Sequence, residues 1–188
     1  MQSFRKLVVI VAASAATLAA THPPFSLTGP LPAHTGGFGE PTCHACHFDY
    51  PLNEPGAAIY LDSLPEVFEP QREYRLRLRV QHAELKRGGF QLSARFEDGS
   101  PAGSLVIPDT TLLRIQRAKS IDYLSHTMKG TDELVSDMAI WRFSWVAPGT
   151  NRRVVFNVAV NVADKDASQF GDRIFTKVFY SGGEPIRK

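Results

Sequence analysis

The sequence predicts an all-β protein, an antiparallel β-sandwich of immunoglobulin-like architecture. Apolar and polar residues alternate over several short stretches after residue 57, and almost no stretch has helical periodicity. Turn residues such as Asp98-Gly99 and Pro148-Gly149 end these stretches, which is typical of strands that reverse in tight turns. Seven or eight such strands are enough for two packed layers.

Five stretches alternate most clearly. They are "REYRLRLRV" (72–80), "GGFQLSARFEDGS" (88–100), "AIWRFSWVAPG" (139–149), "RRVVFNVAVNVAD" (152–164) and "GDRIFTKVFYSGG" (171–183). Weaker strands are expected over 57–63, 103–107 and 121–128, and a short helical turn over 111–119. Trp141, Phe143 and Trp145 lie on one face of their stretch, so we expect them in the core.

The chain divides into three parts. Residues 1–20 have the layout of a secretory signal peptide, with Arg5 and Lys6 before an apolar run and small residues at its end. An uncleaved N-terminal anchor is the alternative reading of this segment. Residues 21–56 are rich in Pro and Gly and are expected to be irregular. Residues 57–188 form the predicted sandwich domain, and no further stretch there is long enough to span a membrane.

The charge balance argues against a nucleic-acid partner. The chain has 21 Lys and Arg against 19 Asp and Glu. Loss of Arg5 and Lys6 with the signal peptide leaves the mature chain close to neutral. The densest basic stretch, 72–79, alternates with apolar residues and is interpreted as the solvent face of a strand.

The only two cysteines lie in "CHACH", residues 43–47. C-x-x-C-H is the pattern that attaches haem in c-type cytochromes. In that chemistry Cys43 and Cys46 form thioethers with one porphyrin, and His47 is the proximal iron ligand. The signal peptide supports this hypothesis, because exported thiols are normally taken up by disulfides, metals or cofactors.

Two other uses of the cysteines stay open. Zinc could take Cys43, Cys46 and a histidine such as His82 or His126, although no second paired motif supports such a site. A Cys43–Cys46 disulfide would close a small loop, but redox-active C-x-x-C pairs normally begin a helix in an α/β fold, which this sequence lacks.

Five segments in order, "TGGFGEPTCHACH", "GGFQL", "DYLSHT", "WRFSWVAPG" and "NVADKDASQFGDRIF", resemble the bacterial choice-of-anchor V proteins. The sandwich of that family is related to the Reeler domain. The resemblance runs through most of the mature chain, and it implies a Reeler-like fold with a glycine-containing segment that leads into C-x-x-C-H. The chain departs from the family after Phe179, where no anchor segment follows, so a periplasmic or secreted protein is expected.

The sixth position of a haem iron bound by His47 needs its own ligand. His126 is the first choice, because it lies in the family-like "DYLSHT" segment on an expected strand. Met128 and His34 are the alternatives. A methionine would raise the reduction potential relative to two histidines.

These features predict an exported protein with one covalent haem c that transfers electrons to or from an unidentified partner protein, a cytochrome or oxidoreductase. No substrate-transforming motif is visible, so a redox carrier is favoured over an enzyme. The alternatives are an extracellular binding or adhesion module with a Cys43–Cys46 disulfide, and a haem sensor or small peroxidase. Asp164, Asp166 and Asp172, with Asn161, do not fit an EF-hand and are expected to cap backbone amides.

Overall fold

The computed structural model describes residues 29–132, 134–166 and 168–182. The predicted signal peptide, residues 1–20, lies outside the described residues. Described residues form ten strands: β1 (Ala58–Asp62), β2 (Glu73–Gln81), β3 (Arg87–Phe96), β4 (Ser104–Val106), β5 (Leu113–Ala118), β6 (Ile121–His126), β7 (Leu134–Val135), β8 (Met138–Val146), β9 (Val154–Ala163) and β10 (Arg173–Ser181). Two 3-10 turns, η1 (Cys43–Ala45) and η2 (Lys129–Asp132), complete the regular structure of this part.

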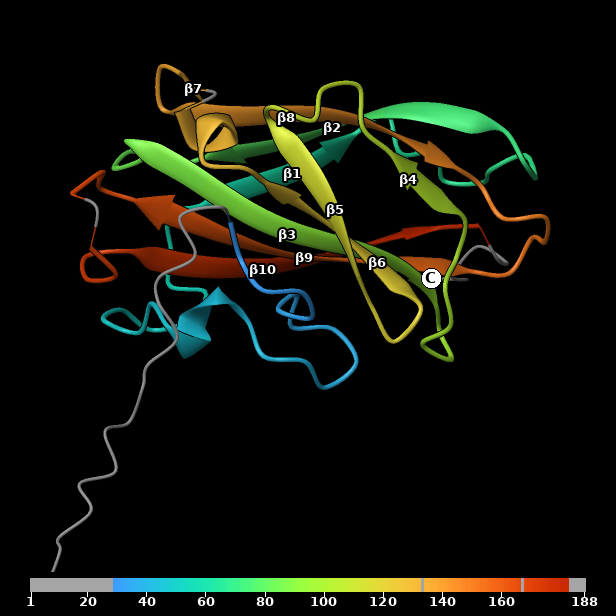
Figure 1. Cartoon of the computed structure of the whole chain (residues 1–188), viewed down its shortest axis with the longest axis horizontal. Coiled ribbons are helices and arrows are strands. Elements are labelled where there is room, and N and C mark those ends of the chain that lie inside the picture. The colour runs from blue at the N-terminus through green and yellow to red at the C-terminus, as the bar shows by residue number, and fades with distance from the viewer. Residues whose placement is uncertain (1–28, 133, 167, 183–188) are drawn as a thin grey trace, which may run out of the picture.

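The strands form two antiparallel five-stranded sheets that pack face to face (Figure 1). The first sheet has the order β1-β2-β8-β4, with β7 also paired to β8, and the second has the order β10-β9-β3-β6-β5. The predicted all-β sandwich is therefore confirmed.

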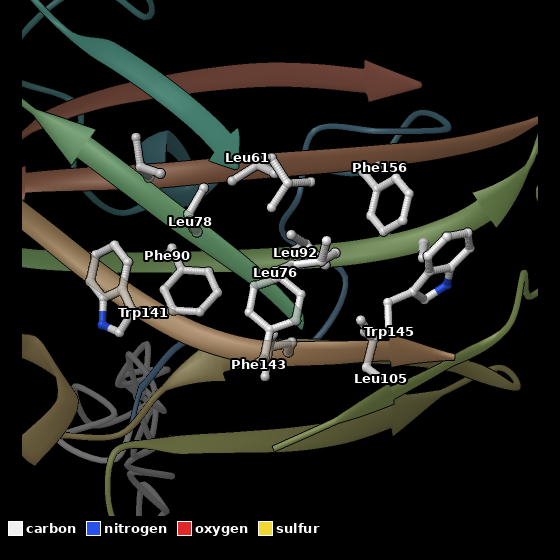
Figure 2. Packing of buried hydrophobic residues seen from close by; sticks show 14 of the residues in the cluster. Leu61, Leu76, Leu78, Phe90, Leu92, Leu105, Trp141, Phe143, Trp145 and Phe156 are labelled. Atoms are coloured by element: carbon white, nitrogen blue, oxygen red, sulfur yellow. The ribbon is translucent and has the colours of Figure 1, made fainter. Parts of the chain in front are cut away.

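The core lies between the sheets and is built by the alternation seen in the sequence (Figure 2). Trp141, Phe143 and Trp145 point inward from β8 and are almost fully buried, as predicted. They meet the inward residues of β3 and β9, and Trp145 packs edge-on against Phe156 at a centroid distance of 5.1 Å. Because side chains alternate along a strand, the intervening residues of β3 and β9 point to the other face of their sheet.

One local prediction is wrong. Residues 111–119 were expected to form a helical turn, but Leu113–Ala118 form strand β5, which pairs with β6. The hairpin turns at Lys119 and Ser120, whose φ values of 47° and 65° match the left-handed conformation that two-residue hairpin turns require. The strand expected over 121–128 is present as β6, which ends two residues earlier, at His126.

The second sheet is covered on its outer face as well. Residues 29–56 run along the side of β9 and β10 that faces away from β2 and β8, where Figure 1 shows them in blue and cyan. This segment forms no long strand, in agreement with the expected irregular structure, and a single bridge joins Thr35 and Thr42. Several outward residues of β3, β6 and β9 are consequently buried although they are polar, namely Gln91, Ser93, Arg95, Ser125 and Asn157.

Candidate functional site

The C-x-x-C-H sequence forms one tight turn on the covered face of the second sheet. Thr42 caps the turn, because its hydroxyl accepts a hydrogen bond from His44 N at 3.1 Å. The amides of Cys46 and His47 both donate to the carbonyl of Cys43, at 3.2 and 3.1 Å. A single turn therefore carries both thiols and the imidazole of His47.

The two cysteines are free thiols in different environments. Cys43 is partly buried against the sheet and Cys46 is exposed. Burial, together with the charges of the nearby Cys46 and Asp172, raises the pKa of the Cys43 thiol to about 12. Cys43 is thus protonated at neutral pH, which is unsuited to a catalytic thiolate.

His47 is held by a buried carboxylate. Its Nδ1 lies 2.7 Å from Asp172 Oδ2, and the Asp172 side chain is only 3% exposed. Asn161 donates from Nδ2 to the same Oδ2 at 2.8 Å and lies 3.5 Å from His47 Nδ1. When Nδ1–H donates to the carboxylate, the lone pair of the imidazole is on Nε2. This is the arrangement in which a histidine serves as a metal ligand through Nε2.

His126 ends strand β6, and its ring lies against the main chain of β3. Nδ1 is 2.9 Å from Phe90 N and 3.2 Å from Phe90 O, so it can accept from one or donate to the other, depending on the tautomer. Burial, helped by the charges of Arg114 and His47 and opposed by the hydrogen bond with the Phe90 backbone, lowers the pKa of His126 to about 4. At neutral pH the imidazole is neutral, which a metal ligand must be.

Gly89 provides the space for the His126 ring. A Cβ atom at this position would lie 2.9 Å from His126 Cε1. Gly89 is also the direct cross-strand partner of Asn161 in the register of β3 and β9. Neighbouring strands are about 4.8 Å apart. The ring of His126, from the end of β6, therefore lies over Gly89 of β3, and His47, from the irregular segment, lies beside Asn161 of the adjacent strand β9. The structure therefore brings these two predicted site residues together.

The alternative ligands are placed differently. His34 is half-buried on the same face, where its backbone N donates to Gln91 Oε1 at 2.6 Å and its Nδ1 lies 3.1 Å from Pro32 O. Met128 follows the end of β6 and is 56% exposed. His44, within the motif, is bound by Nε2 to the carbonyl of Tyr50 at 3.0 Å.

The aspartates of the 164–172 loop do not all behave as expected. Asp164 and Asp166 cap backbone amides, those of Asp166 and Ser168, as predicted. For Asp172 the prediction is wrong, because its carboxylate contacts His47 and Asn161 instead of a backbone amide. Nothing in the spacing of the sequence connects position 172 with position 47. Across the described ranges, no three His, Cys, Asp or Glu side chains form a group that could hold a metal ion.

A buried polar cluster, which the sequence analysis missed, fastens the turn-bearing segment to the sheet. The carboxylate of Glu40 forms an ion pair with Arg95 of β3, and it accepts hydrogen bonds from Tyr123 of β6 and from Thr35. The side chains of Arg95 and Glu40 are 6% and 11% exposed. Burial alone would raise the pKa of Glu40, but the hydrogen bonds from Thr35, Tyr123 and Arg95 outweigh it and lower the pKa below its ordinary value.

Exposed aromatic side chains flank the turn. Phe48, directly after His47, is 56% exposed, and Phe170 is 53% exposed. Their rings pack edge to face at a centroid distance of 6.4 Å. Two large apolar side chains that remain solvent-accessible beside the cysteines provide a surface onto which a flat apolar group can pack.

Comparison with known proteins supports the fold. No protein-family model and no curated protein matches the chain. Among solved structures, the Reelin-N domain of F-spondin is similar with a TM-score of 0.52 at 14% identity, covering 76% of this chain and 97% of that one. The human F-spondin reeler domain has a TM-score of 0.46 at 15% identity, covering 71% and 95%. The architecture is accordingly Reeler-like. In the part of the chain that the structure describes, no helix is long and apolar enough to cross a membrane.

Replacement of Glu40 by Gln should destabilise the protein at neutral pH. The variant leaves the buried Arg95 guanidinium without its counter-charge, which costs about 3 kcal/mol. Because the pKa of Glu40 is lower in the folded than in the unfolded state, its contribution is complete above the unfolded value near 4.5 and is lost as pH falls through the folded value. Denaturant unfolding should therefore show a large gap at pH 7 that closes in acid. Glu97→Gln, at an exposed carboxylate, is the control. An equal gap for both variants would contradict the prediction.

Gly89→Ala should displace the His126 ring. The new methyl group meets Cε1 at 2.9 Å, and overpacking of this kind costs about 1–3 kcal/mol. We expect a loss of stability in denaturant titrations together with a shift of the His126 ring resonances in NMR spectra. Gly149→Ala is the matched control, because no atom lies within 4 Å of its added Cβ. Unchanged His126 resonances in Gly89→Ala would show that the ring does not occupy this space.

Proposed function

We propose that this protein is an exported mono-haem c-type carrier of electrons. Cys43 and Cys46 would hold the porphyrin by thioether bonds, and Nε2 of His47 would bind the iron. The observation that carries this proposal is the contact of His47 Nδ1 with the buried Asp172, because it leaves Nε2 as the ligating nitrogen of a C-x-x-C-H turn.

The described residues fit a covalently attached haem in three respects. Both thiols and His47 belong to one turn, as attachment to a single macrocycle edge requires. Exposed Phe48 and Phe170 beside the turn offer apolar surface for the porphyrin. Buried Asp172 Oδ1 and Asn161 Oδ1 have no hydrogen-bond partner, and such unpaired atoms suggest that water or another group completes this part of the site.

His126 is the residue that we propose for the opposite side of the iron. Its ring is neutral at neutral pH and lies on the same sheet face as the region that His47 occupies. Donation from Nδ1–H to Phe90 O at 3.2 Å would orient the ring and free Nε2 for coordination. His126 at the end of β6 and His47 beside Asp172 would keep their positions when the iron changes its oxidation state, which suits a carrier of electrons.

Haem c, once attached, supplies an iron that alternates between Fe(II) and Fe(III). The residues of the chain hold and orient it: Asp172 keeps the proton on His47 Nδ1, and the Glu40–Arg95 pair keeps the attachment turn against the sheet. The protein would act in the periplasm or outside the cell, with a cytochrome or oxidoreductase as partner. The choice-of-anchor V resemblance is part of this proposal, and the Reeler-like fold is compatible with it.

A haem sensor or small peroxidase is the second candidate, and one contact favours it. Phe90 N donates to His126 Nδ1 at 2.9 Å, which is shorter than the distance from Nδ1 to Phe90 O. In that tautomer the ring proton is on Nε2, and His126 would donate a hydrogen bond to a small molecule on the iron instead of binding the iron itself.

Protein secreted by a host with haem-maturation machinery should be red and should retain haem on a denaturing gel stained for peroxidase activity. Cys43→Ala with Cys46→Ala should abolish this stain, because no thioether can form. His44→Ala, in the same turn, should keep it, because His44 Nε2 is bound to Tyr50 O. A colourless wild-type protein with a Cys43–Cys46 disulfide would overturn the haem proposal and favour the adhesion module.

His126→Ala tests the opposite ligand. The wild-type absorption spectrum should be low-spin and insensitive to carbon monoxide, and the variant should become high-spin and bind it. His34→Ala and Met128→Leu are the matched controls and should leave the spectrum unchanged. A wild-type spectrum that is already high-spin and shifts with carbon monoxide would favour the sensor or peroxidase. A change confined to one of the two controls would instead move the assignment to that residue.

A further inference from the structure

We propose that Asp172 is a positioning residue that gives the iron bound by His47 a low reduction potential. This inference rests on the proposed function, since it concerns the same site. It assigns to Asp172 two linked tasks: keeping the proton on Nδ1 of His47, and placing a negative charge behind the imidazole.

The contacts of Asp172 suit these tasks. Oδ2 receives both His47 Nδ1 at 2.7 Å and Asn161 Nδ2 at 2.8 Å, and the side chain is almost completely buried. Within the described ranges, no lysine or arginine forms an ion pair with it, and the neighbouring Arg173 is paired with Glu54 and Glu84. The negative charge of Asp172 therefore acts mainly on the imidazole of His47.

The carboxylate is also held in place by the sheet. Asp172 directly precedes β10, and the first residue of β10, Arg173, is paired with Val162 of β9. Asn161, which binds Oδ2, is the neighbour of Val162 on β9. Asp172 and Asn161 are therefore both held by backbone in or next to paired strands, whereas His47 comes from an irregular segment. The ring of His47 thus takes its orientation from the sheet.

The chemical consequence follows from the hydrogen bond. Donation from Nδ1–H to a carboxylate increases the electron density of the imidazole and makes Nε2 a stronger donor. A stronger donor stabilises Fe(III) more than Fe(II), so the reduction potential falls. The carrier would consequently be a stronger reductant than one whose ligating histidine lacks such a carboxylate, and it would pass electrons more readily to a partner of higher potential.

The first test compares the haem-loaded wild type with Asp172→Asn by spectroelectrochemical titration. The amide keeps the shape of the carboxylate but removes its charge. We expect covalent haem in both proteins and a midpoint potential that is clearly more positive in Asp172→Asn. Asp164→Asn, in the same loop but bound to the amide of Asp166, should leave the potential unchanged. Equal potentials in the wild type and Asp172→Asn would overturn the inference.

The second test needs neither haem nor a variant. Nitrogen-15 NMR of the wild-type chain produced without haem-maturation machinery reports the tautomer of His47. We expect a protonated Nδ1 with a strongly downfield proton, and an unprotonated Nε2, at a pH where the ring is neutral. A proton on Nε2 instead of Nδ1 would overturn the inference even where Asp172→Asn fails to fold.

The two proposals fail in different ways. If the wild type takes up no covalent haem, the proposed function fails, and the tautomer measurement still decides whether Asp172 positions His47. If haem is attached but Asp172→Asn does not change the potential, the proposed function stands, and the proposed effect of Asp172 on the reduction potential is wrong.

Discussion

The ion pair between Glu40 and Arg95 is the interaction on which the placement of the site depends. The second sheet is covered over much of its outer face as well as on its inner face, yet the segment that covers the outer face offers almost no strand of its own to pair with. Its attachment must come from side chains, and Glu40 meets three buried donors at once. Because a half-satisfied cluster of buried polar groups is costly, this arrangement selects one position of the segment over others. The cysteine turn, a few residues further on, takes its position from that choice.

The second constraint is space on the sheet surface. In the register of β3 and β6, Gln91 pairs with Ser125 and Leu92 with Leu124, so the next pair would be Phe90 with His126. Strand pairing stops there, and His126 Nδ1 lies within hydrogen-bond distance of both Phe90 N and Phe90 O and can bond to one of them in each tautomer. The ring fits because position 89 has no side chain. One step of strand pairing is thus replaced by a half-buried imidazole that is neutral at neutral pH.

The sequence predicted the inner half of the molecule better than the outer half. Alternation placed the residues of β2, β3, β8 and β9 on the correct faces, because burial against the opposite sheet decides that pattern. It failed for β5, where Leu, Arg, Gln and Ala are good helix formers and the turn at Lys119 and Ser120 lacks the usual Asn-Gly signal. The C-x-x-C-H pattern and His126 could be singled out in the sequence as candidates. Asp172 could not, because its contact with His47 joins positions 125 residues apart through the pairing of β9 and β10.

The division between the two faces explains how a Reeler-like sandwich can accommodate such a site. Inward positions of β3 and β9 build the core, and their identity is dictated by packing. The site uses outward positions of the same strands, Gly89 and Asn161, together with a segment that lies outside the sandwich core. Changes at the outward positions leave the core intact, so the site and the fold can vary independently. A fold shared at 14% identity therefore carries no information on the cysteine turn. Evidence for its chemistry has to come from the contacts of His47 itself, and the buried carboxylate beside Nδ1 is the strongest of these.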